Sequence, residues 1–193
     1  ASAAASPAEN AASYGLKKSD IVAILAIGEV FAWLLMVIRK NIGLAVPFSI
    51  MYALLIIMPL VALFCLWVMA KLGRKRPFLF QMGKYAAIGF FNTALDFGII
   101  NFMVLSTGIT KGPKLGLLNA VSFTVAVINS YFWNKFWTFK TKGGARAGEF
   151  TQFVIVSLVG LILNSGFVSA ITQYVEPPWA LNPQQWVNVV KVI

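Results

Sequence analysis

The sequence predicts an all-α membrane protein that crosses the bilayer several times. Of its 193 residues, 59% are hydrophobic and 11% are charged, whereas a soluble domain has roughly 45–50% apolar and about 25% charged residues. The mean hydropathy of +0.79 also excludes a disordered chain, because disorder requires low hydrophobicity. Five segments have the length of about 20 mostly apolar residues that one helix needs to cross the hydrocarbon core. We therefore expect a polytopic helical bundle.

The expected helices follow one another with short breaks that contain glycine or proline. They cover about residues 20–38, 47–70, 82–106, 115–137 and 150–174. The small, polar residues 1–19 predict a disordered tail, and Ser19 or Asp20 is expected to cap the first helix. A further helix is predicted to begin near Gln184, and we expect it to be truncated, because the sequence ends after ten residues of it.

The positive charges are divided unequally between the two sets of loops. One set carries Lys17, Lys18, Lys71, Arg74, Lys75, Arg76, Lys84, Lys135, Lys140, Lys142 and Arg146. The other set carries Arg39, Lys40, Lys111 and Lys114. Cytoplasmic loops are enriched in lysine and arginine, so we expect the N-terminus to lie in the cytoplasm and the protein in the cytoplasmic (inner) membrane. The net charge of +10 then reflects membrane topology and does not predict a nucleic-acid partner.

Several chemistries are excluded by what the sequence lacks. It has no histidine and one cysteine, Cys65, so it can form neither an intrachain disulfide nor a zinc site of histidines and cysteines. The six acidic residues are scattered singly, and no glycine-rich phosphate loop is present. We expect no metal, no cofactor and no catalytic residue, and hence a protein that is not an enzyme.

A faint repeat relates the third and fifth expected helices at an offset of 68 residues. It places Gly89, Asn92, Asp96 and Gly98 opposite Ser157, Gly160, Asn164 and Gly166. Spacings of three and four put these small and polar residues on one face of each helix, and both helices run outward, so the repeat is parallel. Such a stripe predicts either close helix packing or a functional polar surface.

Asp96 favours the functional interpretation. A carboxylate inside a membrane helix costs roughly 2.5–3.5 kcal/mol on insertion scales and usually faces a polar cavity or a partner. We therefore expect Asp96 to serve a function, or a structure on which a function depends.

Three segments carry a family resemblance. Residues 80–97 read FQMGKYAAIGFFNTALDF, residues 119–139 read NAVSFTVAVINSYFWNKFWTF, and residues 149–164 read EFTQFVIVSLVGLILN. Over about residues 78–193 the chain resembles the GtrA-like family of small membrane proteins. The family has four helices, so the two helices within residues 20–72 are additions in front of its core, and the motif that normally ends its fourth helix is not reached.

The resemblance implies a role in cell-surface polysaccharide or teichoic-acid glycosylation. Its members are proposed either to move polyprenyl-phosphate-linked sugars across the membrane or to anchor a membrane glycosyltransferase. Besides that lipid-linked sugar, the expected partners are membrane lipids, a glycosyltransferase and a second copy of the chain. A small exporter of cations or drugs is a third, more distant alternative.

The chemistry of such a lipid selects candidate site residues. Lys84 and Lys135, at the cytoplasmic ends of two helices, could bind the phosphate, or they could simply snorkel to the interface. Sugar hydroxyls could be bound by Asn92, Asp96, Asn129, Asn134 and Asn164, although these groups could equally satisfy one another. Trp137 could stack on a sugar or line a prenyl groove, or it could belong to an aromatic interface belt.

Two further features lie outside the core of the resemblance. Glu29 falls near the bilayer middle, so Glu29, like Asp96, is a candidate for proton coupling, with a protonated structural role as the alternative. Arg74, Lys75 and Arg76 could contact anionic lipid or an acidic partner enzyme, or they could act only as a topology signal.

Overall fold

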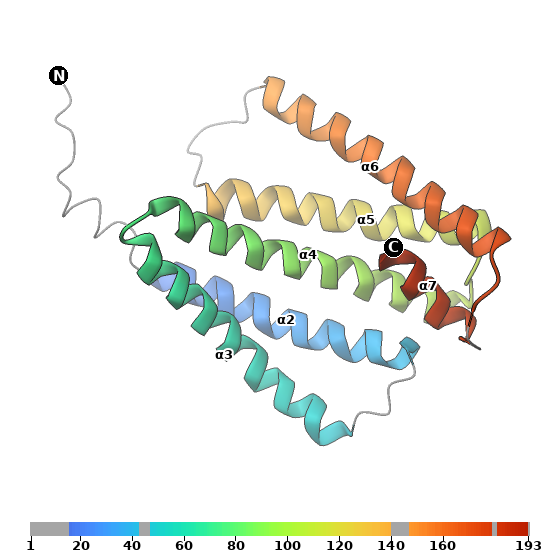
Figure 1. Cartoon of the computed structure of the whole chain (residues 1–193), viewed down its shortest axis with the longest axis horizontal. Helices are drawn as coiled ribbons and strands as arrows, with labels where there is room; N and C mark the ends of the chain where they lie inside the picture. Colours follow the sequence, from blue (N-terminus) through green and yellow to red (C-terminus); the bar gives the residue numbers. More distant parts are fainter. Residues whose placement is uncertain (1–15, 43–46, 140–146, 179–180, 193) are drawn as a thin grey trace.

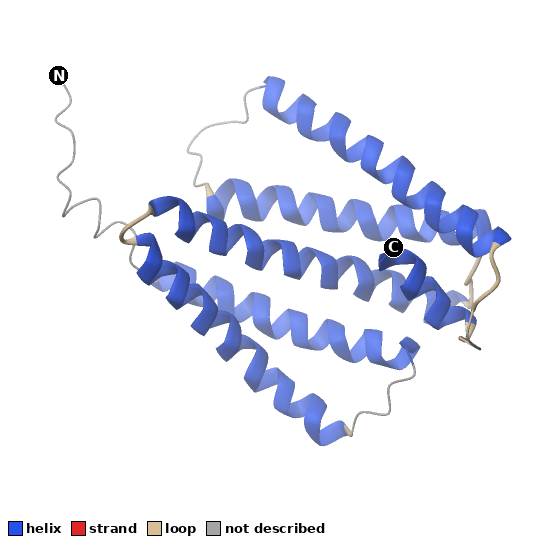
Figure 2. Cartoon of the chain, viewed as in Figure 1, coloured by secondary structure: helices blue, strands red, loops and turns tan. Residues whose placement is uncertain are grey.

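A computed structural model describes residues 16–42, 47–139, 147–178 and 181–192. All the regular structure in this part of the chain is helical (Figures 1 and 2). The elements are α2 (Lys18–Ile42), α3 (Phe48–Gly73), α4 (Pro77–Thr107), α5 (Gly112–Trp133), the π-helical turn η1 (Asn134–Thr138), α6 (Ala147–Tyr174) and α7 (Pro183–Val192).

The predicted fold class is confirmed. Five helices, α2 to α6, are long and apolar enough to cross a membrane, and successive helices run in opposite directions (Figure 1). α4 and α6 therefore point the same way, as the parallel repeat requires. The sixth helix, α7, begins within one residue of its predicted start and has ten residues.

All the described helices except α3 begin earlier than predicted, and α3 begins one residue later, at Phe48. α4 begins at Pro77 and α5 at Gly112, with Pro113 in its first turn, whereas the sequence analysis treated these prolines as loop residues. Proline is well tolerated in the first helical turn, because the backbone N–H that it lacks has no helical acceptor there. The predicted cap was also wrong, since α2 begins at Lys18. Residues 18 and 19 of the predicted tail 1–19 are therefore helical. Residues 1–15 lie outside the described part.

The bundle has two halves joined through α4. α4 packs against α2 and α3 on one side and against α5 on the other, while α6 lies on the far side of α5 (Figure 1). The apolar core is divided in the same way. One cluster joins α2, α3 and α4 around Ile24, Leu66 and Ile88, and a second joins α4, α5, α6 and α7 around Ile100, Leu115 and Val187.

The added helices α2 and α3 approach each other very closely at one point. A Cβ atom built on Gly28 of α2 would lie 2.5 Å from the Cα atom and 2.9 Å from the backbone N atom of Pro59 in α3. Only glycine allows two helix backbones to meet at this separation. The hairpin of α2 and α3 is thus a packed unit that rests on α4.

Candidate functional site

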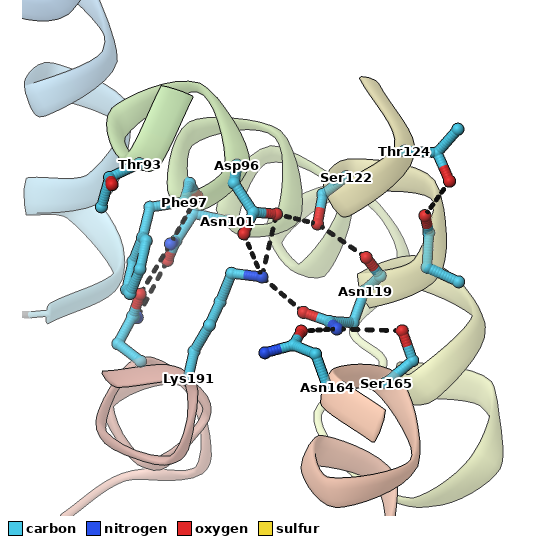
Figure 3. Close-up of polar contacts among 12 residues, drawn as sticks. Thr93, Asp96, Phe97, Asn101, Asn119, Ser122, Thr124, Asn164, Ser165 and Lys191 are labelled. Atoms are coloured by element: carbon cyan, nitrogen blue, oxygen red, sulfur yellow. Dashed lines mark hydrogen bonds and ion pairs between the residues drawn. The ribbon is translucent and has the colours of Figure 1, made fainter. Parts of the chain in front are cut away.

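A polar contact within the bundle joins Asp96 of α4 to Lys191 of α7. The Lys191 Nζ atom lies 2.9 Å from Oδ1 and 2.9 Å from Oδ2 of Asp96 (Figure 3). Asp96 lies about 17 Å along the helix axis from the end of α4, which is one of the candidate membrane spans, so the pair is expected to lie inside a hydrocarbon core that is about 30 Å thick. The sequence predicted that Asp96 would face either a polar cavity or a partner, and in this structure Lys191 is a partner of Asp96.

Asn119 of α5 connects this ion pair to α6. Its side chain is completely buried, and its Oδ1 atom accepts a hydrogen bond from Lys191 Nζ. Its Nδ2 atom donates to Asn164 Oδ1 at 2.6 Å and to Ser165 Oγ at 3.1 Å. Ser122, one turn along α5, donates to Asp96 Oδ1 at 2.6 Å. We refer to Asp96, Asn119, Ser122, Asn164, Ser165 and Lys191 as the central polar cluster; four helices contribute to it (Figure 3).

The predicted repeat converges on this cluster. Asp96 and Asn164 are counterparts at the offset of 68 residues, and they reach the cluster from opposite sides of α5. The alternative interpretation, close packing, holds for part of the stripe. A Cβ atom at Gly98 would meet the side chain of Leu34, and one at Gly160 would lie 3.4 Å from the Phe123 ring, whereas one at Gly89 or Gly166 would have no neighbour within 4 Å. The stripe therefore combines close packing with polar contacts.

Two pairs of asparagines bridge neighbouring helices beside the cluster. Asn129 of α5 donates to Asn92 of α4, with Nδ2 and Oδ1 2.6 Å apart. Asn101 of α4 and Asn188 of α7 exchange two hydrogen bonds of 2.7 and 3.0 Å. Asn92, Asn129 and Asn164 were predicted either to bind sugar or to satisfy one another, and in this structure each bonds a neighbouring asparagine.

The reciprocal pair of Asn101 and Asn188 gives a first testable expectation. Replacing Asn101 by leucine should lower the free energy of unfolding by about 1–2 kcal/mol, because an interhelical hydrogen bond in a membrane contributes about 0.6 kcal/mol on average and a buried amide would lose two. Adding Asn188→Leu should restore part of the loss, since both polar groups are then removed. Unfolding in detergent by a denaturing surfactant measures both values, and a double variant less stable than the single one would contradict the expectation.

Lys84, predicted to bind a phosphate or to snorkel to the interface, is paired inside the bundle. Its side chain is 2% exposed, and its Nζ atom lies 2.5 Å from Oδ1 of Asp20 in α2. Trp137 Nε1 donates to the same oxygen at 3.0 Å. The prediction overlooked Asp20 because it treated this residue as a helix cap, whereas it lies within the first turn of α2 and its Oδ2 atom accepts from the Lys17 N–H at 3.1 Å.

The other predicted phosphate ligand, Lys135, lies in the π-helical turn η1. It is half-buried, and its Nζ atom lies 3.2 Å from the hydroxyl oxygen of Tyr131. Asn134 bonds its own helix, since its Nδ2 atom donates to the backbone oxygen of Ser130 at 3.0 Å. The π geometry is fixed by a 2.9 Å bond from the Phe139 N–H to the Asn134 carbonyl, five residues back. Such turns often lie at functional sites.

The remaining predicted residues lie apart from the central polar cluster. Glu29 accepts a hydrogen bond of 3.1 Å from Trp33 Nε1 on its own helix, α2. Arg74, Lys75 and Arg76 are exposed at the turn between α3 and α4. The predicted roles in proton coupling and in contact with lipid or a partner stay predictions.

An apolar groove of about 430 Å³ lies between α2, α3 and α4. Its lining includes Ile24, Gly28, Met58, Ala62, Gly83 and Ala87, and the remaining lining residues are also apolar or glycine. The volume falls within the range of roughly 300–1,000 Å³ that is typical of ligand pockets. Two of its three walls belong to the added hairpin, so the groove exists only because α2 and α3 precede the core.

A family comparison agrees with this architecture. The model of the GtrA/DPMS transmembrane domain matches residues 84–193, which is more than half of the chain. The chain belongs to this family. GtrA/DPMS membership confirms the resemblance, and together with the five apolar helices it identifies the chain as a multi-pass membrane protein. The GtrA/DPMS match leaves out α2 and α3 and begins at Lys84, the residue that contacts Asp20.

A curated relative matches part of the chain. It is the uncharacterized membrane protein YngA of Bacillus subtilis (strain 168), which is 30% identical over 77 residues. The matched stretch is 40% of this chain and 49% of YngA, so the chain spans about half the length of that relative. No solved structure gives a significant match.

Four residues of the candidate site were not predicted from the sequence. Asn119, Ser122, Asn188 and Lys191 were not selected, although a second offset was present in the sequence. Asn119 and Ser122 of α5 stand opposite Asn188 and Lys191 of α7 at a common offset of 69 residues. Aligning α4 and α5 with α6 and α7 as whole units would have indicated all four.

Proposed function

We propose that this protein binds a polyprenyl-phosphate-linked sugar in the cytoplasmic (inner) membrane and moves it to the other side, without catalysing a covalent step. The observation that carries the proposal is the central polar cluster, in which Asp96, Lys191 and Asn119 meet at bilayer depth. Ionised side chains are expensive in lipid and commonly mark the pathway of a substrate or ion.

The three parts of such a lipid correspond to three features of the bundle. The hydroxyl-rich sugar needs donors and acceptors inside the membrane, and the cluster provides carboxylate, amide, hydroxyl and ammonium groups. The isoprenoid tail needs an apolar surface, and the groove between α2, α3 and α4 is lined by residues of this kind. The phosphate needs cations at headgroup depth, and Lys84 and Lys135 lie near the predicted cytoplasmic ends of their helices.

Translocation, rather than simple binding, is supported by the arrangement of the repeat. α4 and α6 run in parallel, and each contributes to the cluster a side chain that bonds a residue of α5. Transporters built from repeats bind their substrates near the membrane midplane, between the repeats. In this proposal Asp96 accepts contacts from the sugar as Lys191 releases it, and Asp96 is also the candidate for proton coupling.

The test is transbilayer movement in liposomes. Purified protein is reconstituted with a fluorescent short-chain polyprenyl-phosphate sugar, and movement is followed by loss of fluorescence to a membrane-impermeant quencher. Asp96→Asn keeps an acceptor for Ser122 but removes the charge, so the rate should fall by about tenfold or more, which corresponds to about 1.4 kcal/mol in the barrier.

The matched control is Thr124→Val on α5, because this exposed hydroxyl bonds only its own helix, at the Ala120 carbonyl, within the described residues. It should leave the rate unchanged. Movement no faster than in empty vesicles, or equal rates for wild type and Asp96→Asn, would reject the proposed function.

A second candidate function is that of an accessory subunit that holds a membrane glycosyltransferase. The exposed basic turn of Arg74, Lys75 and Arg76 favours it, because such a turn can bind an acidic surface. Reversing these three charges should abolish co-purification of the enzyme, whereas reversing Lys111 and Lys114, at the opposite end of the bundle, should not. A complex that survives the first change would exclude this turn as the docking site.

A further inference from the structure

Three donors surround the carboxylate of Asp20 at the end of the bundle where α2 and α4 begin. Lys84 Nζ and Trp137 Nε1 lie 2.5 and 3.0 Å from its Oδ1 atom, and the Lys17 N–H lies 3.1 Å from its Oδ2 atom. Asp20, Lys84 and Trp137 are all buried, with exposed fractions of 0%, 2% and 7%. The contact joins the added helix α2 to two elements of the family core.

This set of donors has the chemistry of an oxyanion site. An ammonium group, an indole N–H and a backbone N–H are donors without acceptor capacity, and hydrogen bonds between a charged donor and an anion are about twice as strong as neutral ones. The rings of Phe80 and Trp137 lie 4.6 and 5.1 Å from Lys84 Nζ, which further holds the cation in place. The site is built around a negatively charged group, and in this structure that group is a carboxylate.

The π-helical turn beside the site has unused hydrogen-bonding capacity. The Thr138 hydroxyl oxygen and the Asn134 amide oxygen are buried and have no hydrogen-bond partner among the described residues. Buried polar atoms without a partner are rare in proteins and require an explanation. A carboxylate has two oxygens, whereas a phosphate monoester has three that are free to accept, so a phosphate could engage a further donor such as the Thr138 hydroxyl.

The apolar groove begins next to this site. Ile24 lies one helical turn beyond Asp20 on the same face of α2, and Gly83 precedes Lys84 in α4; both line the groove. A ligand with an anionic head and an apolar tail could therefore place the head at Lys84 and the tail between α2, α3 and α4.

We propose that Lys84 and Trp137 form the binding site for a lipid-linked phosphate, and that Asp20 occupies this site as an internal substitute until the lipid displaces it. The inference rests on the proposed function, because it specifies where the phosphate of that substrate binds and how the empty site is kept closed. Asp20 belongs to the added hairpin. The hairpin therefore supplies two of the three walls of the groove, and it also provides the carboxylate that competes with the lipid phosphate for Lys84.

The decisive variant is Asp20→Asn, which keeps the shape of the side chain and removes its charge. Binding of farnesyl phosphate, a short isoprenoid phosphate, is measured in detergent by quenching of tryptophan fluorescence. Asp20→Asn should bind it about tenfold or more tightly than wild type, because the lysine no longer has a competing anion. Adding Lys84→Gln should abolish the gain, whereas Glu176→Gln, which removes an exposed carboxylate beyond the end of α6, should leave the affinity unchanged.

Two further ligands identify the part of the lipid that is recognised. Inorganic phosphate should bind Asp20→Asn detectably but weakly, and farnesol, which lacks the phosphate, should not distinguish this variant from wild type. A gain for farnesol equal to that for farnesyl phosphate would overturn the phosphate site. Equal affinities of wild type and Asp20→Asn for farnesyl phosphate would show that the contact is only a structural ion pair.

A measurement on the unmodified protein covers the case in which Asp20→Asn does not fold. Dicyclohexylcarbodiimide activates a buried carboxyl group, and the lysine amine then displaces dicyclohexylurea to leave an amide bond between Asp20 and Lys84. Saturating farnesyl phosphate should reduce this cross-link, and an unchanged yield would overturn the proposal. If Asp20→Asn gains affinity but no lipid moves in liposomes, the proposed translocation is rejected and the phosphate site is retained. If lipid moves but the affinity of Asp20→Asn is unchanged, only the phosphate site is rejected.

Discussion

Replacing Lys191 by methionine is expected to lower the free energy of unfolding by about 3–5 kcal/mol, the usual cost of removing one partner from a buried ion pair. The change leaves the Asp96 carboxylate with Ser122 but without its cation, and it removes a donor from Asn119. Methionine keeps the length and apolar stem of lysine, so the loss would come from the charge. Surfactant-induced unfolding in micelles, followed by circular dichroism, gives the value.

The double variant Asp96→Asn with Lys191→Met separates charge from packing. It should recover most of the lost stability, because a neutral pair of similar volume is often as stable as a buried ion pair. Lys111→Met is the matched control, since this cation is exposed between α4 and α5, and it should change stability little. A Lys191→Met protein as stable as the control would mean that the ion pair contributes nothing to folding.

Replacing Gly28 by alanine is expected to destabilise the protein by about 1–3 kcal/mol, the typical cost of forcing an additional methyl group into a packed core. The new Cβ atom would meet the backbone of Pro59 at 2.5 Å, and a backbone atom cannot rotate away as a flexible side chain can. α2 and α3 must therefore separate, which would also alter the groove that they line. Unfolding in micelles measures the first effect, and farnesyl phosphate binding measures the second.

Gly89→Ala is the control for this change, because nothing lies within 4 Å of the position that its Cβ atom would occupy. Alanine is the better helix former by up to about 1 kcal/mol, so this variant should be neutral or slightly more stable. The difference between the two variants isolates the contact with Pro59. Equal stabilities would contradict the close approach of α2 and α3.

The fold could be predicted from the sequence because membrane helices are determined mainly by hydropathy. A continuous apolar run, such as the one that forms α3, has few alternatives in lipid, since every backbone group must find its partner inside the segment. The ends were less predictable. A proline can end the helix before it or begin the helix after it, and the sequence around Pro77 and Pro113 is compatible with either role.

The candidate site could be predicted only in part. A carboxylate inside a span identified Asp96, and the repeat identified Asn92 and Asn164, because those signals lie along a single helix. Their partners depend on which helix faces meet, and hydrophobic periodicity does not encode this when a helix is apolar on all sides. Lys191 was overlooked because its contact with Asp96 joins residues 95 positions apart, and Lys84 was assigned to the interface because its contact with Asp20 joins residues 64 positions apart.

The ion pair between Asp96 and Lys191 has a consequence for how the protein enters the membrane. Lys191 lies in α7, and a lysine costs roughly 2.5–3.5 kcal/mol at the centre of a membrane helix on insertion scales. Asp96, which lies 95 residues earlier in the chain, would already be in the bilayer when Lys191 is synthesised. A carboxylate that entered first would then lower the cost of inserting this lysine, and Asp96→Asn should make entry of α7 into the membrane less favourable even where the preceding helices have assembled normally.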